Sequence, residues 1–159
     1  MTFDELYAAH ADRVYAFLRF KIRDAHLVED LFQDTFLTAY EELSRNRVPD
    51  HPRAWILAIA HRRMVDRLRK MPERDVPFQQ LERNGLQDDP DPTDAIFLRE
   101  LLDRLDDLSR TILYALYVEG LTIRETAQFT GLPEGTVKSR SFAARSKLSR
   151  WMKVTEVDE

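Results

Sequence analysis

The sequence predicts an all-α protein built from two small helical domains that a flexible linker joins. Apolar residues recur every three or four positions toward both ends of the chain, and no segment sustains the alternation of apolar and polar residues that marks a β-strand. Only four glycines occur in the 159 residues, and Gly120, Gly131 and Gly135 gather around one predicted turn. An apolar content of 43% is enough for compact cores.

Three helices are expected in the first domain. Thr2 and Glu5 have the spacing of a capping box, so the first helix should start at the N-terminus. The second should start after Asp24, and the third should follow Pro52, which suits the first turn of a helix. The three stripes expected to face the core are Phe3, Leu6, His10, Val14, Phe17 and Leu18; Val28, Phe32, Thr35, Ala39 and Leu43; and Leu57, Ala60, Met64 and Leu68.

Helical periodicity ends where four of the seven prolines and a lone Gly85 stand among acids and amides, which indicates a linker. Beyond it, Thr93 is expected to cap one helix, and Ser109 is expected to begin another that ends at Gly120. The predicted division is a first domain over residues 1–71, a linker over residues 72–92, a second domain over residues 93–153 and a tail over residues 154–159.

The segment 121–140 has the layout of a DNA-reading helix-turn-helix, in which two short helices meet at a glycine. Thr122 and Glu125 form a capping-box pattern, Gly131 supplies the positive φ of a sharp turn, and Pro133 suits the opening of the second helix. The buried face of that helix should carry Val137, Ser141, Ala144 and Leu148. Its outward face, the candidate reading surface, should carry Lys138, Ser139, Phe142, Ala143 and Lys147.

Charge is segregated along the chain, although the formal net charge is only -4. Residues 137–154 carry six bases and no acid, and residues 61–70 carry five Lys or Arg against the single Asp66. Two basic helices of this kind are expected to contact nucleic acid at two places. Residues 24–42 carry six acids and no Lys or Arg, so naked DNA would be repelled there and a protein partner is expected.

Several classes of function find no support in the composition. The chain has no cysteine, and its four dispersed histidines lack metal-ligand spacing, so neither a metal nor a cofactor is expected. No carboxylate cluster, Cys/His pair or phosphate-cradling glycine loop suggests an enzyme. No stretch approaches the roughly 20 apolar residues that span a bilayer, so we expect a cytoplasmic protein without membrane insertion.

With these segments placed, the chain resembles the bacterial sigma factors of the extracytoplasmic-function (ECF) class, which keep only the region 2 and region 4 domains. Residues 28–40 (VEDLFQDTFLTAY) are similar to region 2.2, residues 52–68 (PRAWILAIAHRRMVDRL) to region 2.4, and residues 132–140 (LPEGTVKSR) to region 4.2. The resemblance implies a region 2 helical bundle and a region 4 helix-turn-helix. It also implies an alternative sigma factor that binds core RNA polymerase and directs promoter recognition, strand opening and initiation.

By this resemblance, one face of the second helix docks on the coiled-coil clamp helices of the polymerase β′ subunit, and the core contact includes the β subunit. The face mixes acids with an apolar Leu37, which suits a basic partner helix, while a merely solvated face is the open alternative. The residues implied are Asp30, Gln33, Asp34, Leu37 and Glu41.

The resemblance also assigns the third helix, with the loop before it, to the -10 element of the promoter, where an unstacked base is captured. A solvated basic face is the alternative. Trp55 is assigned to the core that braces the loop, with stacking on a base as the open alternative. Related chains often carry asparagine in place of Arg62. The residues implied are Arg45, Asn46, Arg47, His61, Arg62, Arg63, Asp66 and Arg67.

The helix-turn-helix is assigned to the -35 element, with Lys138, Ser139 and Phe142 against base edges in the major groove. Packing of Phe142 on the first helix of the motif is the open alternative. Many related chains carry arginine in place of Ala143, so one base contact is expected to be missing. The residues better placed for phosphates are Thr136, Arg140, Arg145 and Lys147.

Family members are commonly held inactive by an anti-sigma factor, so a separate inhibitory protein is expected here as well. The rival interpretation is a helix-turn-helix transcriptional regulator with an N-terminal sensing or dimerising module. It predicts a ligand pocket or a dimer interface in residues 1–70, and it leaves the basic surface of residues 62–70 unexplained.

Overall fold

The computed structural model describes residues 1–71 and 100–157, with side chains described as far as Lys153. All regular elements in these ranges are helices, apart from one isolated bridge residue at Ile22, which confirms the predicted all-α class. The described residues form two compact units. The predicted linker and the predicted cap Thr93 lie outside the described residues.

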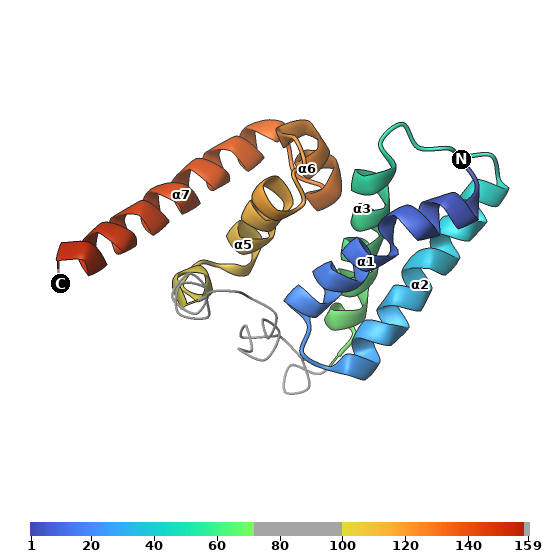
Figure 1. Cartoon of the computed structure of the whole chain (residues 1–159), viewed down its shortest axis with the longest axis horizontal. Helices are drawn as coiled ribbons and strands as arrows, with labels where there is room; N and C mark the ends of the chain where they lie inside the picture. Colours follow the sequence, from blue (N-terminus) through green and yellow to red (C-terminus); the bar gives the residue numbers. More distant parts are fainter. Residues whose placement is uncertain (72–99, 158–159) are drawn as a thin grey trace. The chain divides into compact units, whose positions relative to one another are not determined.

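The first unit is a bundle of three helices, α1 (Phe3–Lys21), α2 (Ala25–Ser44) and α3 (Pro52–Arg69), and each packs against the other two (Figure 1). Their starts are as predicted. The Thr2 hydroxyl accepts a hydrogen bond from the Glu5 N–H at 3.1 Å, and the Asp24 carboxylate accepts from two backbone N–H groups of α2. These caps satisfy backbone donors that have no partner inside the helix.

The buried surface of α2 is wider than the predicted apolar stripe. Val28, Thr35 and Ala39 are buried as expected, but Phe32 and Leu43 are only partly buried. Because α2 packs against α1 on one side and α3 on the other, its buried arc also takes in residues that the stripe omitted, namely Leu27, Leu31 and Phe36. Trp55, expected in the core, is only partly buried.

The second unit begins in the described chain with a helical end at residues 100–103, followed by α5 (Asp107–Leu113). The prediction that this helix begins at Ser109 is wrong, because α5 begins at Asp107. The cap is Asp106, whose extended backbone (φ -64°, ψ 158°) precedes the helix and whose carboxylate accepts the Ser109 N–H at 3.2 Å. Both residue types are good caps, and the backbone conformation decides which of them is used.

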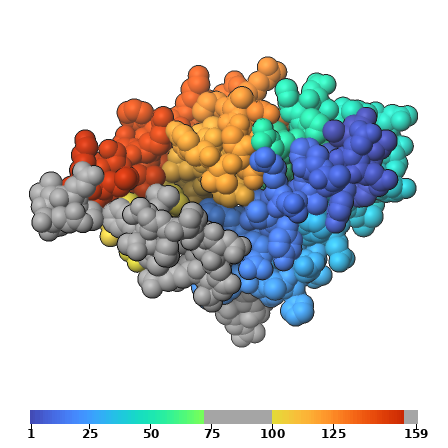
Figure 2. Space-filling model, in the orientation of Figure 1, coloured from blue at the N-terminus to red at the C-terminus, as the bar shows by residue number. Residues whose placement is uncertain are grey.

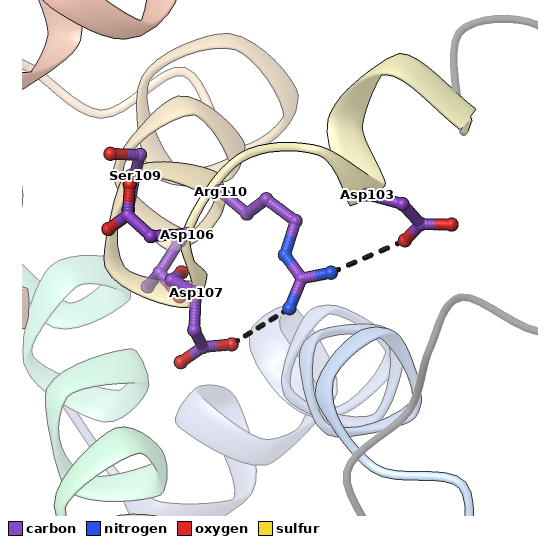
Figure 3. A network of polar contacts seen from close by, with 6 residues as sticks. Asp103, Asp106, Asp107, Ser109 and Arg110 are labelled. Atoms are coloured by element: carbon purple, nitrogen blue, oxygen red, sulfur yellow. Dashed lines mark hydrogen bonds and ion pairs between the residues drawn. The ribbon is translucent and has the colours of Figure 1, made fainter.

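Arg110 of α5 ties the two helical pieces together (Figure 3). Its guanidinium donates to the Asp103 carboxylate at 3.3 Å and to the Asp107 carboxylate at 3.1 Å. The side chain of Arg110 is mostly covered, with 14% exposed, so this fork is better shielded from solvent than an ordinary surface pair. It fixes the residues just before α5 against the helix.

After α5 the chain continues as a short π-helix, η3 (Tyr114–Val118), which ends two residues before the predicted end at Gly120. The Glu119 N–H donates to the Tyr114 carbonyl at 3.0 Å, and Gly120 takes a φ of 69°, a conformation that costs glycine little. The buried Tyr114 hydroxyl donates to the Glu119 carboxylate at 3.1 Å, which provides this buried acid with a partner.

The predicted helix-turn-helix consists of α6 (Ile123–Thr130) and α7 (Glu134–Val157). Thr122 and Glu125 form the predicted capping box, with reciprocal hydrogen bonds of 3.0 and 2.9 Å. Gly131 ends α6 with a φ of 77°. A small core cluster holds the C-terminal half of α7 against the start of the unit, and its members are Leu105, Leu113 and Ala144 with Leu102, Leu148 and Trp151 packed around them.

Candidate functional site

The predicted docking residues of α2 lie together on one exposed face. Positions 30, 34, 37 and 41 follow the helical repeat, so they form a single row, and Gln33 flanks it. Leu37 is 58% exposed within this row of carboxylates. We call this set the α2 face, and it comprises Asp30, Gln33, Asp34, Leu37 and Glu41, all of them exposed.

An open groove of about 540 Å³ adjoins the α2 face, between α1 and α2. Its aromatic rings contact one another, with centroid distances of 5.0 Å for Tyr7 and Phe36 and 5.4 Å for Phe3 and Tyr40. Tyr40 is 54% exposed and Tyr7 is 43% exposed. This aromatic groove is lined by Phe3, Tyr7, Glu29, Phe32, Gln33, Phe36, Leu37 and Tyr40.

Sequence reasoning missed the aromatic groove as a surface. Its signal was present, because aromatic residues recur every four positions at Phe3 and Tyr7 and again at Phe32, Phe36 and Tyr40. Such a spacing places rings on one side of each helix, but it does not say whether that side is buried. Gln33 and Leu37 belong to both the groove and the α2 face, so the two surfaces are continuous.

The loop after α2 is fixed to the end of the helix by a Schellman motif. The Arg47 N–H donates to the Glu42 carbonyl at 3.2 Å, and the Asn46 N–H donates to the Leu43 carbonyl at 3.0 Å. Asn46 takes the left-handed conformation that this motif needs, with a φ of 62°. The Arg47 guanidinium also pairs with the Glu42 carboxylate at 3.0 Å, and all three candidate residues of this loop, Arg45, Asn46 and Arg47, are exposed.

The candidate bases of α3 lie beside α2. The Arg63 guanidinium donates to the Thr38 hydroxyl at 2.8 Å, and the Arg67 guanidinium lies 3.7 Å from the Asp30 carboxylate. Asp66 is the only acid among the candidate residues of α3, and its Oδ1 lies 3.9 Å from the Arg69 Nη2. The four residues Arg62, Arg63, Asp66 and Arg67 are exposed, whereas His61 is partly buried.

The outward face of α7 is as predicted. Val137, Ser141 and Ala144 are buried, and Figure 2 shows the outer edge of α7, in orange to red, open to solvent. Phe142 is 67% exposed, which rules out the alternative that it is buried against α6. The exposed candidates are Lys138, Ser139, Arg140, Phe142, Arg145 and Lys147, beside a partly buried Thr136.

Two candidate side chains of α7 are held by the helix itself. The Ser139 hydroxyl donates to the Thr136 carbonyl at 3.2 Å, and the Arg145 Nε donates to the Ser141 carbonyl at 3.3 Å. The Arg140 guanidinium instead reaches across to the Asp106 carboxylate, 3.5 Å away. The exposed ring of Phe142 and the Arg145 and Arg150 side chains line a shallow groove of about 500 Å³ along α7. An aromatic ring among bases on a helix suits contact with nucleic acid.

Within the described ranges, no cluster of His, Asp and Glu side chains has the makings of a metal site. No helix in those ranges combines the length and the apolar character that a membrane crossing needs.

Comparison with protein families gives two matches that together cover most of the chain. Residues 6–71 match sigma-70 region 2, and residues 98–148 match sigma-70 region 4. The ECF RNA polymerase sigma factor SigM of Bacillus subtilis is 30% identical over 158 residues, which cover 93% of each chain. The RNA polymerase sigma factor CarQ of Myxococcus xanthus is 29% identical over 160 residues, which cover 98% of this chain and 92% of CarQ.

Two solved structures share the fold. CnrH, in complex with the cytosolic domain of CnrY, aligns with a TM-score of 0.66 and 27% identity over 96% of this chain and 88% of CnrH. The sigma factor RpoE of Bartonella quintana, in complex with the anti-sigma factor NepR, aligns with a TM-score of 0.73 over 96% of this chain and 97% of RpoE. At 21% identity, the second likeness concerns the fold alone.

Proposed function

Because the chain belongs to the sigma-70 family as an RNA polymerase sigma factor of the ECF class, we propose that its two units divide core binding and promoter reading between them. The first unit docks on core polymerase and holds the -10 element, and the second unit reads the -35 element. As an initiation factor the chain supplies specificity while the polymerase supplies the chemistry, so the chain itself is not an enzyme. It acts in the cytoplasm, where the polymerase works.

The observation that carries the core-binding proposal is the exposed Leu37 in the row of carboxylates on the α2 face, continuous with the aromatic groove. A carboxylate row repels DNA but attracts a helix that presents Lys or Arg. The apolar side chains of the groove would then supply the buried contact area that an ion-pair network alone does not provide. The clamp helices of the β′ subunit are the proposed partner of this face.

The proposal for the -10 element rests on the exposed arginines of α3 and on the fixed loop after α2. Arg62, Arg63 and Arg67 give α3 a positive edge that can follow a phosphate backbone. The Schellman motif holds Asn46 and its neighbours in one conformation, so a base extruded from the duplex would meet a preformed surface. Arg45, Arg47, His61 and Asp66 complete the proposed set.

The proposal for the -35 element rests on α7. Lys138, Ser139 and Phe142 occupy the exposed N-terminal half of a helix whose opposite side is buried, as a recognition helix requires. Lys138 can donate to guanine acceptors, and the Phe142 ring can contact a thymine methyl group. Thr136, Arg145 and Lys147 flank them and are proposed to contact phosphates. Arg140 is proposed to contact a phosphate only when its guanidinium leaves the Asp106 carboxylate.

We also propose that an anti-sigma factor controls this protein. CnrH and RpoE were both solved with a protein partner, and the partner of RpoE is an anti-sigma factor. The α2 face and the aromatic groove are the surfaces that such an inhibitor would need to cover in order to block docking. We further propose that the domains extend over residues 1–71 and 93–153, which the family matches at residues 6–71 and 98–148 support.

Run-off transcription with purified core polymerase on a library of promoters tests the proposal. We expect RNA from specific start sites only when the chain is added. In a pull-down of core polymerase, Asp34→Lys should reduce binding, because it reverses a charge at the centre of the α2 face. Asp12→Lys makes the same change at an exposed site on α1 and should bind like the wild type. Absence of any specific transcript, or equal binding by the two variants, would contradict the proposal.

A further inference from the structure

Arg140 of α7 faces the carboxylate of Asp106, the residue that caps α5. Its Nη1 lies 3.5 Å from the Asp106 Oδ2, and the two side chains are 45% and 52% exposed. Asp106 precedes α5 and is 34 residues away in the sequence, so the pair forms only when α5 and α7 are packed together. This places a negative charge beside the basic face that is proposed to contact DNA.

Asp106 is held in place by the helix that it caps. Its Oδ2 accepts the Ser109 N–H at 3.2 Å, and the N-terminal end of α5 stabilises a negative charge at this position. Partial burial alone would raise the pKa of Asp106, but hydrogen bonds from Ser109 and the charge of Arg140 together bring the pKa below its ordinary value of 3.8. The carboxylate is therefore charged at neutral pH, and its position is set by α5 rather than by Arg140.

A phosphate and the Asp106 carboxylate compete for the same guanidinium. Both are anions that accept hydrogen bonds from Arg140, and a guanidinium that donates Nη1 to one has fewer donors for the other. The carboxylate is already in place before DNA arrives, and it is fixed by a second hydrogen bond. The pair thus partly offsets one positive charge of the α7 surface.

We infer that Asp106 restrains Arg140 and keeps it off the phosphates, and that it thereby sets the sequence-independent affinity of α7 for DNA. The inference rests on the proposed function of α7 as the -35 reader. Lys138, Ser139 and Phe142, which are proposed to read bases, are not part of the pair, so sequence preference is left unchanged while general attraction is weakened. A chain with such a restraint spends less time on DNA that lacks a promoter.

The test uses the full chain, with fluorescence anisotropy at several salt concentrations on a -35 duplex and on a scrambled duplex of the same composition. Asp106→Asn removes the charge but keeps the cap, because the asparagine side-chain oxygen can accept the Ser109 N–H. We expect about two- to fivefold tighter binding to both duplexes, the gain that an exposed ion pair can withhold. The plot of log affinity against log salt should steepen by about 0.9, the value for one added phosphate contact.

Two further variants decide whether the effect passes through Arg140. Asp107→Asn makes the same charge change one residue away, where the carboxylate pairs with Arg110 instead, and it should give a smaller gain. The double variant Asp106→Asn with Arg140→Ala has the same net charge as the wild type. It should return to wild-type affinity and salt slope.

Each other outcome overturns the inference. If Asp106→Asn gains no more than Asp107→Asn, the restraint does not exist. If the double variant keeps the gain in affinity, Asp106 acts on DNA without Arg140. If the affinity of the double variant falls below that of the wild type, Arg140 already contacts a phosphate in the wild-type chain. A wild-type holoenzyme that binds the -35 duplex no better than the scrambled duplex would instead contradict the proposed function of α7. Thermal unfolding of Asp106→Asn should remain one cooperative transition slightly below that of the wild type, because the charge is lost but the cap survives.

Discussion

Asp30 of α2 and Arg67 of α3 form an ion pair, with the Asp30 Oδ2 3.7 Å from the Arg67 Nη2. The pair joins the face proposed for polymerase to the edge proposed for the -10 element. Both side chains are largely exposed, at 59% and 44%, so its contribution to stability is small. A polymerase group that binds Asp30 would compete with Arg67 and leave that guanidinium available to DNA.

Asp30→Asn is therefore expected to change function more than stability. Loss of a surface ion pair should lower the free energy of unfolding by less than about 1 kcal/mol, measured by urea denaturation. The same variant should bind core polymerase more weakly in a pull-down, because the α2 face loses a charge. Arg67→Ala breaks the same pair from the other side and should leave core binding unchanged while reducing strand opening. Equal core binding by Asp30→Asn and wild type would argue against a role for Asp30 in docking.

The aromatic groove and the α2 face share Leu37, which provides a second prediction. Leu37→Ser should weaken core binding with little loss of stability, since the side chain is 58% exposed and contributes little to the core. Val48 is also 58% exposed but lies outside the groove, so Val48→Ser is the matched control and should bind core normally. Phe36, which is only 4% exposed, should behave differently. Phe36→Ala is expected to cost about 3–5 kcal/mol of stability, measured in urea.

Lys138 and Phe142 are expected to differ from the phosphate-contacting residues of α7 in how they affect sequence preference. Lys138→Ala should cost about 1–3 kcal/mol of binding at one -35 base pair and little at the others, as a lost base contact does. Lys147→Ala, at an exposed position proposed to contact a phosphate, should weaken binding to every sequence alike. The measurement is holoenzyme binding to a set of single-base-pair variants of a -35 element. A uniform loss with a shallower salt dependence would make Lys138 a phosphate contact instead.

Local chemistry explains why so much of the fold could be predicted. The caps at Thr2, Asp24 and Thr122 and the turn at Gly131 depend on residues within three or four positions, and all four are present in the structure. The outward face of α7 follows from helical geometry alone. The helix start predicted at Ser109 was wrong because two good cap residues, Asp106 and Ser109, stand three positions apart. Only the path of the chain before α5 distinguishes them.

The features that sequence reasoning missed depend on how helices pack. The aromatic groove requires α1 and α2 to place their aromatic rings side by side, and the spacing of rings within each helix does not determine that. The Arg140 and Asp106 pair joins residues 34 positions apart. The sequence showed six bases in residues 137–154 but could not show that Asp106, the cap of α5, offsets one of them.

Asp106 also predicts a pH dependence of stability. Its pKa is lowered in the folded chain: burial opposes the shift, but hydrogen bonds from Ser109 and the charge of Arg140 exceed it. A carboxyl group with a lowered pKa stabilises the fold above its ordinary pKa of 3.8, and this stabilisation is lost as the pH falls through the lower, folded value. Urea denaturation of the wild type between about pH 5 and pH 3 should therefore show a loss of stability that is smaller in Asp106→Asn, which has no proton to take up. Asp12→Asn, an exposed acid on α1, should follow the wild type. Identical pH profiles for wild type and Asp106→Asn would mean that the interactions of this carboxylate with Ser109 and Arg140 do not stabilise the fold.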